Sequence, residues 1–217
     1  MLVEELRKKY LESGDIERLL EGSGIEILKE FLANWDNILE FNRKYYAKGE
    51  PKTVLCGINP GRLGAGKTGV PFIDFKSLSQ LIPNVMRDDT ERSAQFFYEV
   101  VKHFGAELFY NSFYVTNVSW VGYAKRQKTQ KNVNYSDLPI PARDAVLSLF
   151  GYEMNLVKPI TVISLGGLVK ETVDSVIGPS VRTNITLLHP NYCAFPKNRE
   201  RCKRQYIEIL EPFVKKT

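Results

Sequence analysis

Hydrophobic positions follow two different periods along the chain. Over residues 3–48 apolar side chains return every three or four positions, a spacing typical of helices. From residue 53 onward, short apolar runs rich in β-branched and aromatic residues alternate with helical patterns. We therefore predict a helical extension over residues 1–50, packed on a core domain over residues 51–217, in a chain that forms a single domain overall.

The core domain contains apolar runs of strand length. Strands are predicted at Thr53–Ile58, Phe109–Val118, Ile160–Leu165 and Thr183–Leu188. Helices are predicted over 90–105, 140–156 and 199–213, and a further helix follows Gly166-Gly167 and ends at about residue 176. Strands separated by helices favour a parallel sheet with helices on both faces. The predicted fold class is α/β: a three-layer α/β/α sandwich with a central, mainly parallel four-stranded sheet. Ligands bind beyond the carboxyl ends of such strands.

Composition narrows the function only slightly. The formal net charge of +5 and the pI of about 9.0 suit a polyanionic partner. The three cysteines are sparse and lack zinc-site spacing, which fits a reducing compartment. The N-terminus is charged from its first residues and no apolar run approaches a membrane span. We expect an intracellular, cytoplasmic protein, nucleoid-associated if bacterial, with no membrane partner.

Residues 61–68 match the phosphate-binding pattern G-x-x-x-x-G-K-[ST]. In a nucleotide-binding loop, Lys67 and Thr68 would open a helix whose N-terminus holds the phosphates. Here Gly69 and Pro71 follow, and both oppose a helix. The other strands end in Gly166-Gly167 and in His189 rather than in the aspartate that would hold magnesium. A nucleotide hydrolase is therefore the less favoured alternative.

Residues 57–72 read G-I-N-P-G-R-L-G-A-G-K-T-G-V-P-F. This run resembles the first motif of the single-strand-selective monofunctional uracil-DNA glycosylases, in the uracil-DNA glycosylase superfamily. The resemblance extends over about residues 50–212 and includes Lys131-Asn132, Asp137-Leu138-Pro139, Arg143-Asp144 and His189-Pro190. After His189-Pro190 the sequence N-Y-C-A-F-P-K departs from the family's usual continuation, which indicates a divergent bacterial-type branch.

The resemblance implies a DNA-repair enzyme that flips out uracil and hydrolyses its N-glycosidic bond, leaving an abasic site. Asn59 resembles the residue that positions water, and His189 the one that stabilises the departing base; no metal or cofactor is implied. An amide is too weak a base to activate water strongly, so we expect a dissociative reaction. Base-binding residues by resemblance are Gly57, Ile58, Gly61, Phe72 and Asn117.

Each base-binding residue type suits its role. An amide such as that of Asn117 donates and accepts, matching O4 and N3–H of uracil, and the ring of Phe72 offers a stacking surface. Gly61 stands where some relatives carry a tyrosine, so 5-hydroxymethyluracil and other deaminated or oxidised bases are expected substrates. Alternatively, Asn117 only ends a strand, and Phe72 and His189 belong to the core.

DNA is the expected partner, and a monomer suffices for the reaction. The predicted DNA-binding residues are Lys67, Lys125, Arg126, Lys128, Lys131, Asn191, Tyr192, Phe195, Lys197 and Arg199, with Arg201, Lys203 and Arg204 in the same basic segment. Tyr192 or Phe195 is the candidate wedge that replaces the extruded base. Charge runs equally fit a solvated surface. A catalytically inactive DNA-binding relative remains the other alternative.

Overall fold

The computed structural model describes residues 1–126 and 131–215. Its centre is a four-stranded sheet in the order β3-β2-β6-β7, in which every neighbouring pair is parallel. The strands are β2 (Thr53–Gly57), β3 (Phe113–Asn117), β6 (Thr161–Leu165) and β7 (Arg182–Leu187). Every residue of β3 and β6 is buried, as in parallel sheets covered on both faces. The predicted fold class is confirmed.

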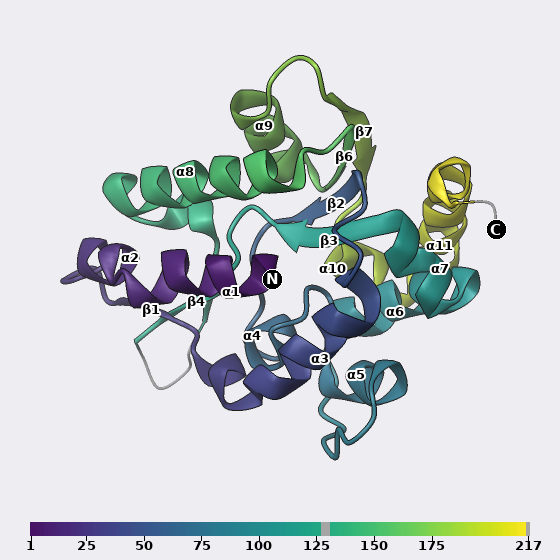
Figure 1. Cartoon of the computed structure of the whole chain (residues 1–217), viewed down its shortest axis with the longest axis horizontal. Coiled ribbons are helices and arrows are strands. Elements are labelled where there is room, and N and C mark those ends of the chain that lie inside the picture. The colour runs from purple at the N-terminus through teal and green to yellow at the C-terminus, as the bar shows by residue number, and fades with distance from the viewer. Residues whose placement is uncertain (127–130, 216–217) are drawn as a thin grey trace.

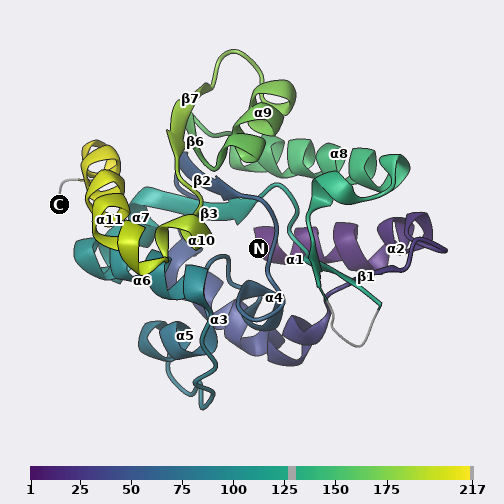
Figure 2. The same ribbon diagram turned by 180° about the vertical axis from the view of Figure 1, so that it is seen from behind.

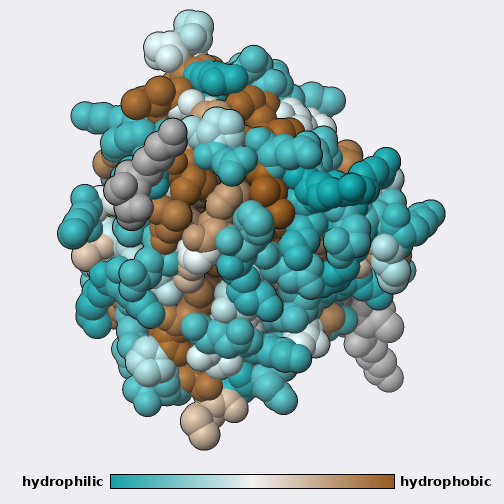
Figure 3. All heavy atoms as spheres, turned by 90° about the vertical axis from the view of Figure 1, so that its right-hand side faces the viewer, coloured by the Kyte–Doolittle hydropathy of each residue, from teal (hydrophilic) through white to brown (hydrophobic). Residues whose placement is uncertain are grey.

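Helices cover both faces of this sheet (Figures 1 and 2). α8 (Ile140–Val157) and α9 (Gly167–Val176) lie on one side, and α6 (Arg92–Phe104) and α10 (Pro190–Cys193) on the other. α11 (Pro196–Leu210) follows α10, and Tyr206 packs edge-on against Phe96 of α6. At the edge that carries β7 and α11, hydrophobic residues reach the surface between hydrophilic ones (Figure 3).

Shorter elements connect this framework. They are α4 (Ala65–Thr68), α5 (Phe75–Leu81), α7 (Ala106–Ser112) and the 3-10 turns Tyr135–Asp137 and Glu211–Phe213. Helix α7 corrects the prediction that a strand begins at Phe109. Phe109 and Tyr110 are buried on a helix, and β3 begins only at Phe113. A short, wholly apolar run has no polar face to distinguish a buried helix from a buried strand.

The N-terminal segment is mainly helical, with one unpredicted strand. It contains α1 (Leu2–Arg7), a π-helical turn (Lys8–Glu12), α2 (Asp15–Leu19), a 3-10 turn (Glu30–Asn34) and α3 (Trp35–Tyr46). β1 (Ile25–Ile27) pairs antiparallel with β4 (Tyr123–Lys125), which pairs with β5 (Asn132–Val133). The helical spacing around Ile27 was misleading because this short strand is stabilised by a partner about 100 positions away in the chain.

The N-terminal segment supports the glycine-rich loop that follows β2. The amide nitrogen of Asn34 donates to the carbonyl of Lys67 at 3.1 Å. A side-chain carbon of Leu28 lies 3.0 Å from where a Cβ on Gly66 would stand, so no larger residue fits there without displacement. The segment therefore positions the loop, although the proposed division at residue 50 stays a prediction. No helix in the described part of the chain is long and apolar enough to cross a membrane.

A carboxyl group is buried between α8 and the sheet. Glu153 is fully buried, and its Oε1 accepts hydrogen bonds from the hydroxyls of Tyr114 (2.9 Å) and Thr116 (2.7 Å). Its Oε2 has no partner among the described residues. Burial raises the pKa of Glu153 to about 7, against the opposing effect of the two hydrogen bonds.

We expect the free energy of unfolding to fall as pH rises from about 4.5 to about 7. In that interval the folded chain keeps a proton on Glu153 that the unfolded chain has lost, so the slope from this group approaches 1.4 kcal/mol per pH unit, as an order of magnitude. Glu153→Gln removes the titration and should flatten this dependence. Urea unfolding at pH 5, 6, 7 and 8 tests it; parallel pH profiles for the two proteins would contradict it.

Candidate functional site

The carboxyl ends of the four central strands meet around one cavity. Gly57 ends β2 opposite Asn117, which ends β3, and His189 follows β7 beside Gly166, which follows β6. The cavity has a volume of about 260 Å³. It is lined by Ile58, Asn59, Pro60, Gly61, Gly64, Ala65, Phe72, Glu91, Ser93, Asn117, Asn132, Asn134, His189 and Asn191. The structure thus brings together the residues for which the sequence predicted catalytic and base-binding roles; Gly57 lies directly behind them.

Gly57 allows two lining side chains to meet. A Cβ at this position would stand 2.3 Å from Cζ of Phe72 and 2.4 Å from Oδ1 of Asn117. Neither atom belongs to a long flexible side chain, so a larger residue would displace the ring or the amide. Asn117 is 3 % exposed, which places its amide at the floor of the cavity.

Phe72 forms an aromatic wall. Its backbone has φ +57°, a left-handed conformation that is uncommon for a residue with a bulky side chain. Its ring stacks on that of Phe97 with a centroid distance of 4.9 Å and an interplanar angle of 27°. The ring centroid of His189 lies 6.5 Å away. Such an unfavourable backbone conformation, kept in place by surrounding packing, is typical of functional sites.

The imidazole of His189 has a defined orientation. Its Nδ1 accepts a hydrogen bond from the backbone N–H of Asn191 at 3.1 Å, so the neutral ring carries its proton on Nε2. Burial lowers the pKa of His189, while the negative charge of Glu91 acts in the opposite direction. The neutral ring therefore offers Nε2–H as a hydrogen-bond donor.

The side chain of Asn59 is held by the segment around β5. Its Oδ1 accepts from the backbone N–H of Tyr135 at 3.0 Å, and its Nδ2 donates to the carbonyl of Val133 at 3.3 Å. Oδ1 of Asn132 in turn accepts from the backbone N–H of Arg62 at 3.1 Å. These bonds fix the amide of Asn59 and bind the glycine-rich loop to the 132–135 segment.

Sequence reasoning did not include several residues that line the cavity. Glu91, Ser93, Asn132 and Asn134 were all missed as site residues. Asn132 belonged to a block that resembles the family, so its position was a usable signal. Glu91 lies at the start of the helix predicted over 90–105, a position that indicates a cap rather than a site, and only the packing of α6 brings it to the cavity.

The geometry of the glycine-rich loop does not suit a nucleotide. α4 ends at Thr68, and Gly69 takes φ +71°, so the chain turns away where a phosphate-binding helix would continue. The Thr68 hydroxyl is buried and donates to the carbonyl of Ile73 at 2.7 Å. Nζ of Lys67 lies 3.1 Å from Oδ1 of Asp89. Hydrogen bonds from Arg87 and then Lys67 lower the pKa of Asp89 to about 2.

The predicted DNA-binding residues fall into two groups. Lys67 and Arg199 are paired within the protein, Arg199 with Glu99 at 2.7 Å, so a phosphate contact from either would require its ion pair to open. Lys128 lies outside the described residues. The others are exposed: Lys125, Arg126, Lys131, Asn191, Tyr192, Phe195 and Lys197. Of these, Arg126 also has an ion pair, with its Nε 3.6 Å from Oε2 of Glu26. Their contacts with DNA stay predictions.

The two candidate wedge residues are held differently. Tyr192 is 46 % exposed, and its hydroxyl accepts from Arg201 at 3.3 Å. Phe195 is 41 % exposed, and the guanidinium of Arg92 lies 5.0 Å from its ring centroid. Because the guanidinium rests on the ring of Phe195, Tyr192 is the less obstructed of the two.

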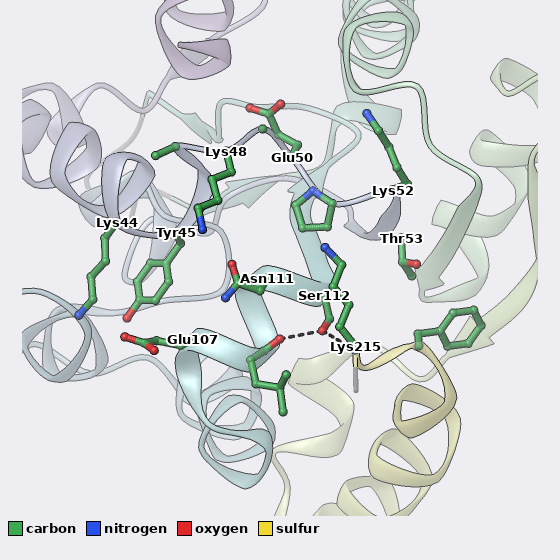
Figure 4. Close-up of a pocket in the computed structure, with 15 residues that line it drawn as sticks. Lys44, Tyr45, Lys48, Glu50, Lys52, Thr53, Glu107, Asn111, Ser112 and Lys215 are labelled. Carbon is green, nitrogen blue, oxygen red and sulfur yellow. Dashed lines mark hydrogen bonds between the residues drawn. The ribbon is translucent and has the colours of Figure 1, made fainter. Parts of the chain in front are cut away.

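A larger cavity of about 750 Å³ lies at the opposite end of the strands, beside Thr53 and Ser112 (Figure 4). Several lysines line it, but Nζ of Lys44 donates to the carbonyl of Leu81, and Nζ of Lys52 to that of Val157. It contains none of the residues singled out by the sequence. Ligands of parallel α/β sheets bind beyond the carboxyl ends of the strands, so the smaller cavity is the candidate site.

Within residues 1–126 and 131–215, no group of three His, Cys, Asp or Glu side chains is arranged to hold a metal ion.

A family model described as the uracil DNA glycosylase superfamily matches residues 43–211. This chain belongs to that superfamily. The superfamily acts on DNA and hydrolyses the bond between a base and its sugar, and the chain is accordingly a DNA glycosylase.

A solved relative supports this membership of the uracil-DNA glycosylase superfamily. The chain is similar to the crystal structure of wild-type SMUG2 from Pedobacter heparinus, with 28 % sequence identity and a TM-score of 0.74. The match covers 87 % of this chain and 88 % of that one. A search of the curated proteins returned no match. The resemblance found in residues 57–72 therefore extends to the fold of nearly the whole chain.

Proposed function

We propose that this protein is a monofunctional uracil-DNA glycosylase that releases the base and leaves an abasic site. The observation that carries the proposal is the convergence of Asn59, Phe72, Asn117 and His189 on one cavity of about 260 Å³. A cavity of this size at the strand ends suits a single flipped base. The residues offer a stacking ring, a base-reading amide, a hydrogen-bond donor for the leaving group and an amide for water.

The proposed reaction begins when a flipped uracil enters between Phe72 and the opposite wall, and its O4 and N3–H meet the amide of Asn117. The C1′–N1 bond breaks with its electron pair leaving on the base, and Nε2–H of His189 stabilises the charge on O2. Water near Asn59 then adds to C1′ and releases a proton to solvent. No lysine stands among the described residues that line the cavity, which supports hydrolysis by water without an amine intermediate.

The direct test uses oligonucleotides that each carry one uracil, as a single strand and as a duplex. The enzyme should produce alkali-dependent cleavage at the uracil and no cleavage before alkali. Asn59→Ala should slow the reaction while DNA binding persists. Binding without any base release would instead indicate an inactive relative, and cleavage without alkali would refute monofunctional action.

We expect Gly61 to admit a substituent on C5 of the base. A Cβ at Gly61 would meet only Nδ2 of Asn132, at 3.5 Å, so the backbone tolerates a side chain there. Gly61→Tyr should therefore keep uracil excision but lose most excision of 5-hydroxymethyluracil, because the ring would occupy the space beside C5. Excision of uracil, 5-hydroxymethyluracil and thymine by both proteins is the measurement. Equal 5-hydroxymethyluracil rates would refute the assignment.

The proposed partner is damaged DNA bound by a monomer. The exposed basic residues Lys125, Arg126, Lys131 and Lys197 are proposed to contact phosphates, and Tyr192 to fill the space left by the flipped base. The arrangement of Tyr192 beside Arg201 supports this choice, since the guanidinium steadies the phenol at the surface.

A further inference from the structure

Glu91 lines the cavity beside the proposed catalytic residues, and the mechanism above leaves it without a role. Its side chain is anchored at the start of α6. Oε1 accepts from the N–H and the hydroxyl of Ser93, both at 3.0 Å, and Oε2 accepts from the N–H of Ala94 at 2.9 Å. These bonds hold the carboxylate in one orientation, and the helix N-terminus complements a negative charge.

Glu91 is also distinctive in its charge. Among the described residues that line the cavity, it is the sole acidic one, and no lysine or arginine accompanies it. Asn59, the residue proposed to position water, contributes a neutral amide. A dissociative reaction places positive charge on the sugar, and no other lining residue supplies a negative charge to meet it.

The position of Glu91 favours the sugar over the base. Asn117, which would read the base edge, lies at the cavity floor. Glu91 instead borders the glycine-rich loop, where a Cβ on Gly64 would stand 3.4 Å from its Oε2. Because the sugar stays joined to the DNA backbone, it must remain nearer the mouth of the cavity than the base does, and Glu91 is half-buried where Asn117 is buried.

We propose that Glu91 is a catalytic residue that stabilises the positive charge on the sugar while the glycosidic bond breaks. The inference rests on the proposed function. As the electron pair of C1′–N1 leaves with the base, C1′ and the ring oxygen share the positive charge, and the anchored carboxylate faces it. The carboxylate neither gains nor loses a proton. Its charge is preorganised, so it needs no reorganisation during the reaction.

Single-turnover excision of uracil and of 5-fluorouracil by the full chain tests the role. Fluorine makes the departing base a better leaving group without changing the sugar. Glu91→Gln should slow the excision of both bases by the same factor, about tenfold or more. DNA affinity, measured by fluorescence anisotropy, should not weaken. Glu107→Gln is the matched control: it neutralises an exposed glutamate in the first turn of α7, outside the cavity, and should keep a rate close to wild type.

A second pair of variants distinguishes a loss of charge from a folding defect. Asp and Asn are both good helix caps of nearly the same size, and Asn lacks the negative charge. Glu91→Asp should therefore be faster than Glu91→Asn at equal thermal stability. The proposal would be overturned by equal rates for this pair, or by an unchanged rate in Glu91→Gln. It would also be overturned if Glu91→Gln slowed the excision of uracil more than that of 5-fluorouracil, because Glu91 would then act on the base or through His189. Wild-type protein that releases neither base would overturn the proposed function itself.

Discussion

Replacement of Gly57 by alanine should almost abolish base excision. The added Cβ would stand 2.3 Å from the ring of Phe72 and 2.4 Å from the amide oxygen of Asn117. Both distances are too short for atoms that are not bonded to each other. Both groups would have to move, and both are proposed to hold the base. We expect kcat/KM for uracil to fall by at least about 100-fold, because displacement of about 1 Å in a binding site has such effects.

The same substitution should cost roughly 1–3 kcal/mol of stability, the usual range for overpacking a well-packed site. Gly61→Ala provides the matched control, since a Cβ there makes an ordinary 3.5 Å contact with Asn132, and its excision rate should stay near that of wild type. Single-turnover kinetics and urea unfolding of the two variants give both quantities. A fully active Gly57→Ala variant would show that Phe72 and Asn117 do not form the base site.

Substitution of His189 by alanine should slow uracil excision by about 100- to 1000-fold, the usual effect of removing a donor that stabilises developing negative charge. The Nδ1 contact with Asn191 directs Nε2–H as the donor, and alanine offers none. The loss should be smaller for 5-fluorouracil, because a better leaving group needs less stabilisation. Rates for both bases at saturating enzyme are the measurement.

The other histidine supplies the control for this experiment. His103 lies near the end of α6, exposed, and does not line the cavity. His103→Ala should excise both bases at the wild-type rate. If His189→Ala slowed both bases equally, His189 would act on the sugar or on the fold, and the division of labour between His189 and Glu91 would be wrong.

The residues at the strand ends were accessible from the sequence because they follow their strands directly. Asn59 comes two residues after β2, Asn117 ends β3, and His189 comes two residues after β7. The carboxyl ends of parallel strands share one edge of a sheet, so local succession along the chain was enough to expect these side chains near one another. The roles assigned to them still await the experiments above.

Other features depended on packing between distant segments. β1 forms because it pairs with β4. Helix α7 replaces part of a predicted strand because Phe109 packs against Phe97 of α6 and Tyr110 against Phe41 of α3. The charge of Lys67, which the sequence matched to a phosphate contact, is instead paired with Asp89. None of these partners is close in sequence, so no local sequence pattern predicts the contacts.

The amino-acid order alone determined the α/β class and the set of polar and aromatic residues at the carboxyl ends of the strands. These follow from short-range periodicity and from a contiguous motif. Only the tertiary structure decided that Asn132 and Tyr135 brace the opposite loop, and that Glu91 joins the cavity. The physical reason is that such contacts depend on how helices and loops dock in three dimensions, where favourable burial and hydrogen bonding outweigh local preference.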